Sequence, residues 1–348
     1  MSTTMGKPAG CGLIRVGRFS LLWDIRALCA GSLLLILVLA TMLFCLAGNG
    51  ISAGEVLTTL RGHGDPLQQL LLYELRLPRL LAGLLSGAAL GAAGCLMQTL
   101  ARNRLATPGM VGLDNGATAF AVASIVAVPT SLAPSALALT GAATAAALTF
   151  MLAAGGGARG YRFIVVGLGV GALFGAVTNL MLARADMDAA NAAYPWTIGS
   201  LNARPSQAVW LLALGLAVGL PMALTMTRAL SIMRFSDSVA ITLGVRMHTT
   251  RTAILALSVT LTGLAVAVAG PLGLVSLLAP EIARYLNKWR GVPVLNAAWS
   301  GSLLTLLADW VGRTALAPME IPVGIVMALV GAPYLLWIIL RQPDRSTS

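Results

Sequence analysis

Apolar residues fill this chain in long runs that short polar segments separate. A run of about twenty apolar residues is long enough for an α-helix to cross a bilayer core of about 30 Å. The runs are continuous rather than alternating, which favours helices over the strands of a barrel. The pattern predicts about ten spans, at residues 27–47, 79–100, 109–128, 135–154, 163–183, 207–227, 252–270, 272–284, 294–312 and 322–340.

Composition supports the same interpretation. The 348 residues are 57% hydrophobic and 10% charged, and their mean hydropathy is +0.86. A soluble domain of this size could not bury that much apolar surface. Backbone groups in lipid must also satisfy their own hydrogen bonds. We therefore expect an all-α polytopic membrane protein in which the span at 272–284 is too short to cross comfortably.

The basic residues indicate how the spans are oriented. With the N-terminus inside, most of the 23 lysines and arginines fall on the cytoplasmic side, as the positive-inside rule requires. The exceptions lie in the external segments: Arg61, Arg76, Arg79, Arg184, Arg204 and Arg313. This predicts a basic cytoplasmic tail at 1–26, a membrane domain at 27–341 and a cytoplasmic tail at 342–348. The net charge of +11 then reflects topology and needs no nucleic-acid partner.

The sequence lacks the residues that several kinds of chemistry require. The only lysines are Lys7 and Lys288, and neither ends a Gly-x-x-x-x-Gly-Lys loop, so any ATPase must be a separate chain. The two histidines and four cysteines lack metal-ligand spacing. We expect no cofactor, no resident metal and no enzymatic activity. A transported metal would arrive enclosed in an organic chelator.

Small residues are dense in the spans, which predicts close helix packing. Two pairs of segments are also similar at an offset of five spans. LLSGAALGAAG in the second span resembles LTGLAVAVAG in the seventh, and VGLGVGALFGAV in the fifth resembles VGIVMALVGAPY in the tenth. Such an offset would suit an inverted five-helix repeat.

Six motifs follow one another along residues 27–341: Arg76-x-Pro78-Arg79 before a Gly/Ala-rich span, Asn103-x-Leu105-Ala106-x-Pro108, Trp196-x-x-Gly199-Ser200-Leu201, Ala240-x-x-Leu243-Gly244-Val245, AGPLGLVSLLAPEIAR at 269–284 and PVGIVMALVGAPYLLWIILR at 322–341. In this order they resemble the FecCD permeases of bacterial ABC importers. Five positions depart from the family pattern. Thr107 stands where an acid is frequent, Leu274 where phenylalanine is usual, and Asp114 where a small or hydroxylic residue is common. Arg104 stands where proline is usual, and Glu281 stands where histidine is usual.

The resemblance implies roles for three groups of residues. Arg76, Arg79 and Arg313 would receive carboxylates of a soluble binding protein, although they could instead anchor at the interface or pair internally, for example with Glu74 or Asp309. Asn103 and Leu105 would form a cytoplasmic gate, unless Asn103 only caps a helix. In the cytoplasmic loop 228–251, Ala240, Leu243, Gly244 and Val245 would couple to the ATPase; this basic segment could otherwise lie on anionic lipid.

Two further acidic residues have simpler interpretations. Glu281 is spaced to pair with Arg284 on one helix face, and Asp114 is placed to cap the span at 109–128.

The implied protein is the permease of a binding-protein-dependent importer with type II ABC importer architecture. Its partners would be two ATPase subunits, an extracytoplasmic binding protein, a second permease subunit and the lipid bilayer. It would reside in the bacterial inner membrane and carry a ferric siderophore, ahead of haem or cobalamin. The alternatives are a stand-alone secondary transporter or exporter of a small organic solute and, more remotely, a membrane scaffold.

Overall fold

The computed structural model describes residues 11–16, 19–47, 52–63, 65–126, 133–153, 161–202, 204–287 and 291–341. Ten of its helices match the ten predicted spans: α1 (Ile25–Leu46), α4 (Leu77–Ala101), α5 (Leu113–Val126), α6 (Pro134–Leu152), α7 (Tyr161–Arg184), α9 (Ser206–Met233), α11 (Met247–Ala269), α12 (Gly273–Leu286), α13 (Val294–Thr314) and α14 (Val323–Arg341). Six helical segments are long and apolar enough to cross a membrane by themselves. The short span predicted near 272–284 is confirmed as the 14-residue α12. The tail residues 1–10 and 342–348 lie outside the described part.

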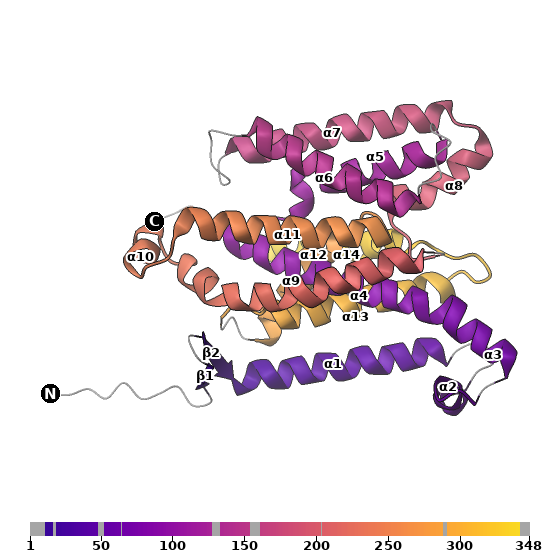
Figure 1. Ribbon diagram of the computed structural model, residues 1–348, viewed down its shortest axis with the longest axis horizontal. Helices are drawn as coiled ribbons and strands as arrows, with labels where there is room; N and C mark the ends of the chain where they lie inside the picture. Colours follow the sequence, from indigo (N-terminus) through magenta and orange to yellow (C-terminus); the bar gives the residue numbers. More distant parts are fainter. Residues whose placement is uncertain are drawn as a thin grey trace.

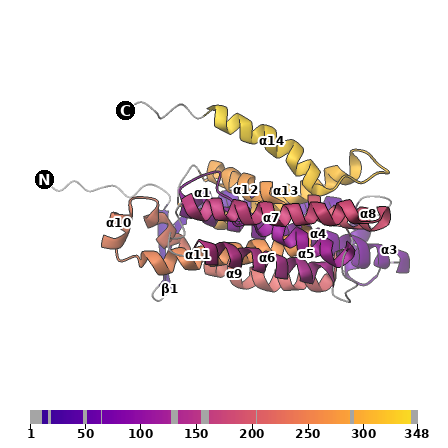
Figure 2. The same cartoon turned by 90° about the horizontal axis from the view of Figure 1, so that it is seen from above.

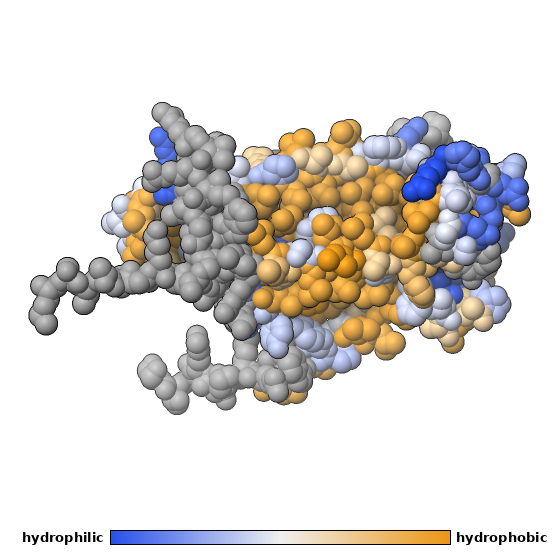
Figure 3. Space-filling view, turned by 90° about the horizontal axis from the view of Figure 1, so that it is seen from below, coloured by the Kyte–Doolittle hydropathy of each residue, from blue (hydrophilic) through white to orange (hydrophobic). Residues whose placement is uncertain are grey.

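The bundle is built around α4, which contacts α9, α11, α12 and α13. Helices α5, α6 and α7 form a layer on one side, and α1 lies against α13 on the other side (Figure 1). Helix α14 packs on α12 and α13 and leans away from the bundle (Figure 2). Apolar residues form a broad band across the middle of the face in Figure 3. This band has the position expected of a lipid-facing surface.

Helices α4 and α13 approach each other more closely than side chains would allow. A Cβ atom on Gly301 would lie 2.0 Å from the backbone oxygen of Gly87. A Cβ atom on Gly91 would lie 2.1 Å from the oxygen of Ala297. The Ser302 hydroxyl donates to the backbone oxygen of Leu84 at 2.8 Å beside this contact. The small-residue packing predicted for this region is confirmed, and it is required at these positions.

Short elements add to the predicted spans. Strands β1 (Cys11–Val16) and β2 (Phe19–Asp24) form an antiparallel hairpin within the segment predicted to be a tail. Helices α2 (Ala53–Leu60) and α3 (Pro66–Leu70) follow α1, and the π-helix η1 (Leu71–Arg76) continues into α4. The 3₁₀-helix η2 (Pro108–Val111) precedes α5. Arg76 and Arg79 therefore belong to one continuous helical segment.

Two predicted loops contain helix. The segment expected to be an external loop before the sixth span contains α8 (Met187–Ile198), whose first turn is capped by the Asp186 carboxylate accepting from the Ala189 amide at 2.7 Å. The predicted loop at 228–251 is shorter than expected. Its first six residues belong to α9, its last five to α11, and between them lies α10 (Asp237–Thr242). Leu230 and Met233 are fully buried, so packing extends α9 beyond the predicted end of the span.

The short elements define the two ends of the bundle. We call the end with α2, α3 and α8 the α8 end, and the end with the hairpin and α10 the α10 end (Figure 1). Helix α14 runs toward the α10 end (Figure 2).

Candidate functional site: polar clusters at the two ends of the bundle

A buried carboxylate organises the α8 end. Asp309 in α13 is only 3% exposed, and its Oδ1 lies 3.0 Å from the Arg79 guanidinium of α4. Its Oδ2 lies 3.1 Å from Nε of Arg313, one turn further along α13. A buried charge without such partners would cost several kcal/mol. The internal pairing with Asp309 considered for these arginines is therefore confirmed for Arg79 and Arg313.

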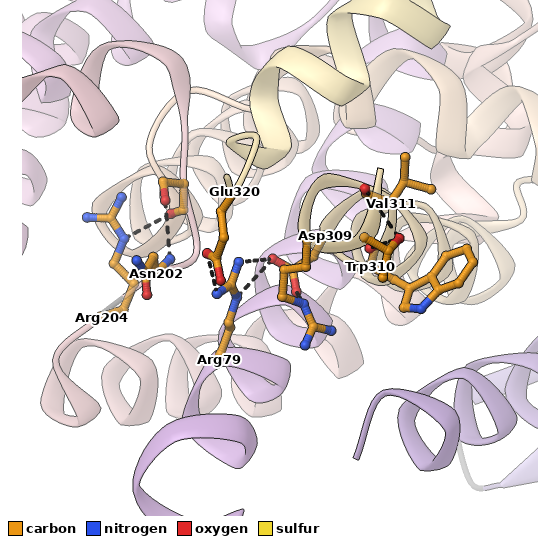
Figure 4. Close-up of polar contacts among 10 residues, drawn as sticks. Arg79, Asn202, Arg204, Asp309, Trp310, Val311 and Glu320 are labelled. Atoms are coloured by element: carbon orange, nitrogen blue, oxygen red, sulfur yellow. Dashed lines mark hydrogen bonds and ion pairs between the residues drawn. The ribbon is translucent and has the colours of Figure 1, made fainter. Parts of the chain in front are cut away.

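Arg79 also reaches a second acid. Its Nη1 lies 2.9 Å from Glu320 Oε2, in the segment between α13 and α14, and Glu320 is about half exposed (Figure 4). Arg79 thus connects α4 to two parts of the chain more than 200 residues away. We call Arg79, Asp309, Arg313 and Glu320 the Asp309 cluster.

Arg76, the third predicted docking residue, lies outside the Asp309 cluster but near it. Its guanidinium donates to the backbone oxygen of Leu46 at the end of α1. All three predicted arginines are therefore at the α8 end, with Arg79 and Arg313 already neutralised by carboxylates.

Sequence reasoning missed a specific role for Arg204, in the segment that connects α8 to α9. Its guanidinium lies 3.9 Å from the centre of the Trp196 ring and its Nε donates to the Ser200 backbone oxygen at 2.9 Å. Burial lowers the pKa of Arg204 to about 10. Figure 4 draws Arg204 and Asn202 to the left of the Asp309 cluster, with the Arg204 guanidinium turned away from it. A cation over an aromatic face is a stabilising contact.

At the α10 end, α4 stops in an unusual conformation. Arg102 has φ +52°, in the left-handed region that non-glycine residues seldom adopt. The amide of Asn103 then donates to the Gln98 oxygen at 3.1 Å, and the Asn103 side-chain oxygen accepts from the Leu105 amide at 2.9 Å. Asn103 thus shapes the segment from Arg102 to Thr107, which we call the elbow. Leu105 is 38% exposed at its tip.

One carboxylate connects the elbow to α10. Asp237, the first residue of α10, has Oδ1 2.8 Å from Nη2 of Arg102 and Oδ2 2.5 Å from Nη2 of Arg251 in α11. Arg102 also donates to the Met233 oxygen at the end of α9, at 2.9 Å. The elbow, α9, α10 and α11 are therefore held together at Asp237. Sequence reasoning did not single out this residue.

The four residues predicted to couple to an ATPase form one compact turn. Ala240 is fully buried, and its backbone oxygen accepts from the Val245 amide at 3.0 Å. Gly244 has φ +80°, which closes the turn. Leu243 is 61% exposed and Ile241 is 60% exposed, so the turn presents apolar side chains at a polar end of the bundle. We call residues 240–245 the α10 turn.

Two of the residues that depart from the family pattern, Glu281 and Arg104, lie close to each other. Glu281 pairs with Arg284 at 2.7 Å, as the i, i+3 spacing predicts, and also lies 3.6 Å from Arg104 in the elbow. The two departures are thus complementary in charge. Asp114 is in the first turn of α5, where its carboxylate lies against Gly109 and Gly273. Among the described contacts its side chain makes no hydrogen bond to a helix amide, so its predicted capping role is not observed.

A helical bundle in which six described segments are long and apolar enough to cross a membrane is typical of a multi-pass membrane protein. The chain belongs to the FecCD transport family, whose model matches residues 33–341. The predicted family membership is thereby confirmed.

Curated relatives cover most of the chain. The achromobactin transport system permease CbrC of Dickeya dadantii is 35% identical over 94% of this chain and 96% of its own length. The Fe(3+) dicitrate transport system permease FecC of Escherichia coli is 34% identical over 88% and 95%. The hemin transport system permease HmuU of Yersinia pestis is 34% identical over 78% and 84%.

A solved structure has the same fold. A metal-chelate type ABC transporter in an inward-facing conformation superimposes with a TM-score of 0.76 and 24% identity, and the match covers 90% of this chain and 99% of that chain. The expected all-α permease architecture is therefore confirmed. The inverted five-helix repeat stays a prediction.

Proposed function

We propose that this permease carries an iron chelate, most simply a ferric siderophore, inward through a bacterial inner membrane with energy from a separate ATPase. Support comes from its relatives, whose names include achromobactin, iron dicitrate and hemin systems. The observation that carries the mechanism is the link through Asp237 between the α10 turn and the elbow. Among the described residues no group of three or more histidine, cysteine, aspartate or glutamate side chains could hold a metal ion, which suits a chelated cargo.

The α10 end is proposed to be cytoplasmic. Many arginines of the described part lie on segments at this end, where they fit the positive-inside rule: Arg102, Arg104, Arg228, Arg234, Arg246, Arg251 and Arg284. The α8 end would then face outward and meet a soluble binding protein. Arg76, Arg79 and Arg313 would receive its acidic residues, since guanidinium groups pair with carboxylates in a two-point geometry.

Coupling would begin at the α10 turn. Exposed Leu243 and Ile241 are suited to an apolar groove on an ATPase, and Gly244 gives the turn its shape. Closure of two ATPase subunits would displace α10. Because Asp237 forms an ion pair with Arg102, the displacement of α10 would reach the elbow directly. Asn103 and Leu105 would then open or close the inner end of a path between two permease subunits, with Leu105 excluding water.

Purification in mild detergent, followed by mass spectrometry, tests the assembly. We expect an ATPase containing a P-loop at one copy per permease. Reconstitution of that complex into liposomes should then give uptake of radioactive iron as a siderophore complex only when ATP and the binding protein are present. Uptake by the permease alone under a proton or sodium gradient would contradict the proposal and favour a secondary transporter.

A further inference from the structure

A basic cavity of about 420 Å³ lies at the α10 end, and Arg102, Asn103 and Arg104 of the elbow form part of its wall. Its wall is formed by the last turn of α4, the end of α9, the last turn of α12 and the residues before α13. Four of the residues that line it are arginines: Arg102, Arg104, Arg234 and Arg284. Cavities of this size hold small ligands or headgroups.

Positive charge exceeds negative charge in this cavity. Glu281 is shared between Arg284 and Arg104, and Asp237 is shared between Arg102 and Arg251, which lies outside the cavity. Arg234 donates to the backbone oxygen of Gly291 at 3.1 Å, and among the described residues no carboxylate lies within ion-pair distance of it. Three of the four guanidinium groups thus share two carboxylates and Arg234 pairs with neither, which leaves an excess of positive charge facing the cavity.

The cavity is also preorganised. Gln98 is 3% exposed, and its amide nitrogen donates to the backbone oxygens of Ser276 and Leu277 at 3.2 and 3.3 Å. These bonds orient the Gln98 side-chain oxygen, which accepts from Nη2 of Arg284 at 2.6 Å. A buried amide therefore fixes one guanidinium in the wall. Fixed guanidinium groups bind phosphate oxygens with little loss of side-chain freedom.

We propose that this cavity binds a phosphate group, and that its source is the headgroup of an anionic phospholipid such as phosphatidylglycerol. The cavity lies where α4, α9 and α12 end, and the ends of membrane-spanning helices lie at the depth of lipid headgroups. Val292 and Pro293 add apolar wall beside the arginines, which suits the glycerol part of a lipid. A free phosphate ion presents the same oxygens, so the source must be separated by experiment. The site does not depend on which chelate is transported.

The test compares lipid binding by the purified full chain and by variants at Arg234. Native mass spectrometry and thermal unfolding in detergent are measured with added phosphatidylglycerol, with phosphatidylcholine and with inorganic phosphate. We expect retention of phosphatidylglycerol and a higher Tm with that lipid only. Arg234→Gln should weaken lipid retention about tenfold, and Arg234→Lys should keep most of it. Arg246→Gln is the matched control, because Arg246 is exposed at the same end and lies outside the cavity.

Each other outcome has a defined meaning. An equal loss in Arg246→Gln and Arg234→Gln would show diffuse attraction and overturn the proposal. Unchanged lipid retention in Arg234→Gln would also overturn it. Stabilisation by inorganic phosphate alone would keep the phosphate site but reject the lipid source. Loss of the ATPase from lipid-free Arg234→Gln complexes would assign the cavity to a protein interface instead. If Arg234→Gln fails to fold, the unmodified chain decides: retention of phosphatidylglycerol no greater than that of phosphatidylcholine would overturn the proposal.

Discussion

Arg102 and Asp237 are 135 positions apart in the chain, yet the guanidinium of one donates to the carboxylate of the other at 2.8 Å. Arg102 ends α4 and begins the elbow, while Asp237 begins α10. In the proposed mechanism, a movement of α10 would act on the elbow through this ion pair.

Replacement of Asp237 by asparagine should separate ATP hydrolysis from transport. The change removes the charge that holds Arg102 and Arg251, while the similar size of the side chain preserves packing. Coupling through such a contact is worth about 1–2 kcal/mol, so uptake in liposomes should fall about tenfold, with ATP hydrolysis little changed. Asp188→Asn, at an exposed acid of α8, is the control and should leave both rates unaltered. Parallel loss of both rates would contradict a coupling role.

Gly244 should tolerate asparagine better than alanine. A Cβ at this position would meet no atom within 4 Å, so the constraint is the positive φ and not a lack of space. Alanine in that region costs about 1–2 kcal/mol, and asparagine costs less. The uptake rate should therefore be highest with glycine at position 244, lower with asparagine and lowest with alanine. The bulky Gly244→Trp variant should also lose ATPase binding; normal uptake by it would exclude the α10 turn from coupling.

Reversal of charge at Arg76 and Arg79 should weaken docking of the binding protein. Arg76→Glu combined with Arg79→Glu would place carboxylates opposite carboxylates, and the Kd should rise at least about tenfold. Surface plasmon resonance on the reconstituted complex measures this, and co-purification of the ATPase should be intact. Arg184→Glu is the control, because Arg184 is exposed at the same end and makes no described ion pair. Equal docking by both variants would refute the assignment.

Gly301→Ala should destabilise the protein. The new methyl group would meet the Gly87 oxygen at 2.0 Å, and overpacking of this kind costs about 1–3 kcal/mol. Gly263→Ala in α11 is the control, since its Cβ would have an ordinary contact of 3.6 Å with Ala142. Thermal unfolding in detergent should show a lower Tm for Gly301→Ala alone. Equal Tm values for Gly301→Ala and Gly263→Ala would mean that α4 and α13 adjust to the methyl group without loss of stability.

The first turn of α2 should open as the pH falls. Glu55 accepts from the Ser52 amide at 2.6 Å, and hydrogen bonds from Ser52 lower the pKa of this carboxyl. A lowered pKa in the folded state means that stabilisation is present above the unfolded pKa and is lost as pH falls through the folded pKa. Hydrogen exchange of the α2 amides should accelerate over that interval. Glu55→Gln should remove the pH dependence; if it persists, another group is responsible.

The spans were predictable because each is encoded locally. Twenty apolar residues in a row specify a membrane helix whatever surrounds them, and this placed α1, α4 and α11 within a few residues. Helix α8 was missed because it is short, contains Pro195 and depends on a single cap at Asp186. The hairpin was missed because its strands have no hydrophobic run long enough to stand out in a basic segment.

The candidate sites show the same difference: pairs close in the sequence were predictable, and pairs far apart in the sequence were not. Glu281 and Arg284 were paired correctly because three residues of helix fix their separation. Arg79 and Asp309 are 230 positions apart, and only the packing of α4 on α13 makes them partners. Asp237 and the cavity around Arg234 could not be inferred for the same reason. A single sequence does not report which helix ends meet.

The glycine contact between α4 and α13 restricts where the molecule can deform. At Gly87, Gly91 and Gly301 backbone lies against backbone, so no rotamer is available to accommodate sliding. Two helices joined in this way move as one rigid body. Any alternation between two shapes must then be accommodated elsewhere, where longer side chains separate the helices. Helix α14 is not such a place, because a Cβ on Gly324 would lie 1.6 Å from the backbone oxygen of Ile198. Helix α6 meets α11 through side chains, with a Cβ on Gly263 at 3.6 Å from Ala142, so we expect the layer of α5, α6 and α7 to move against α4 and α13.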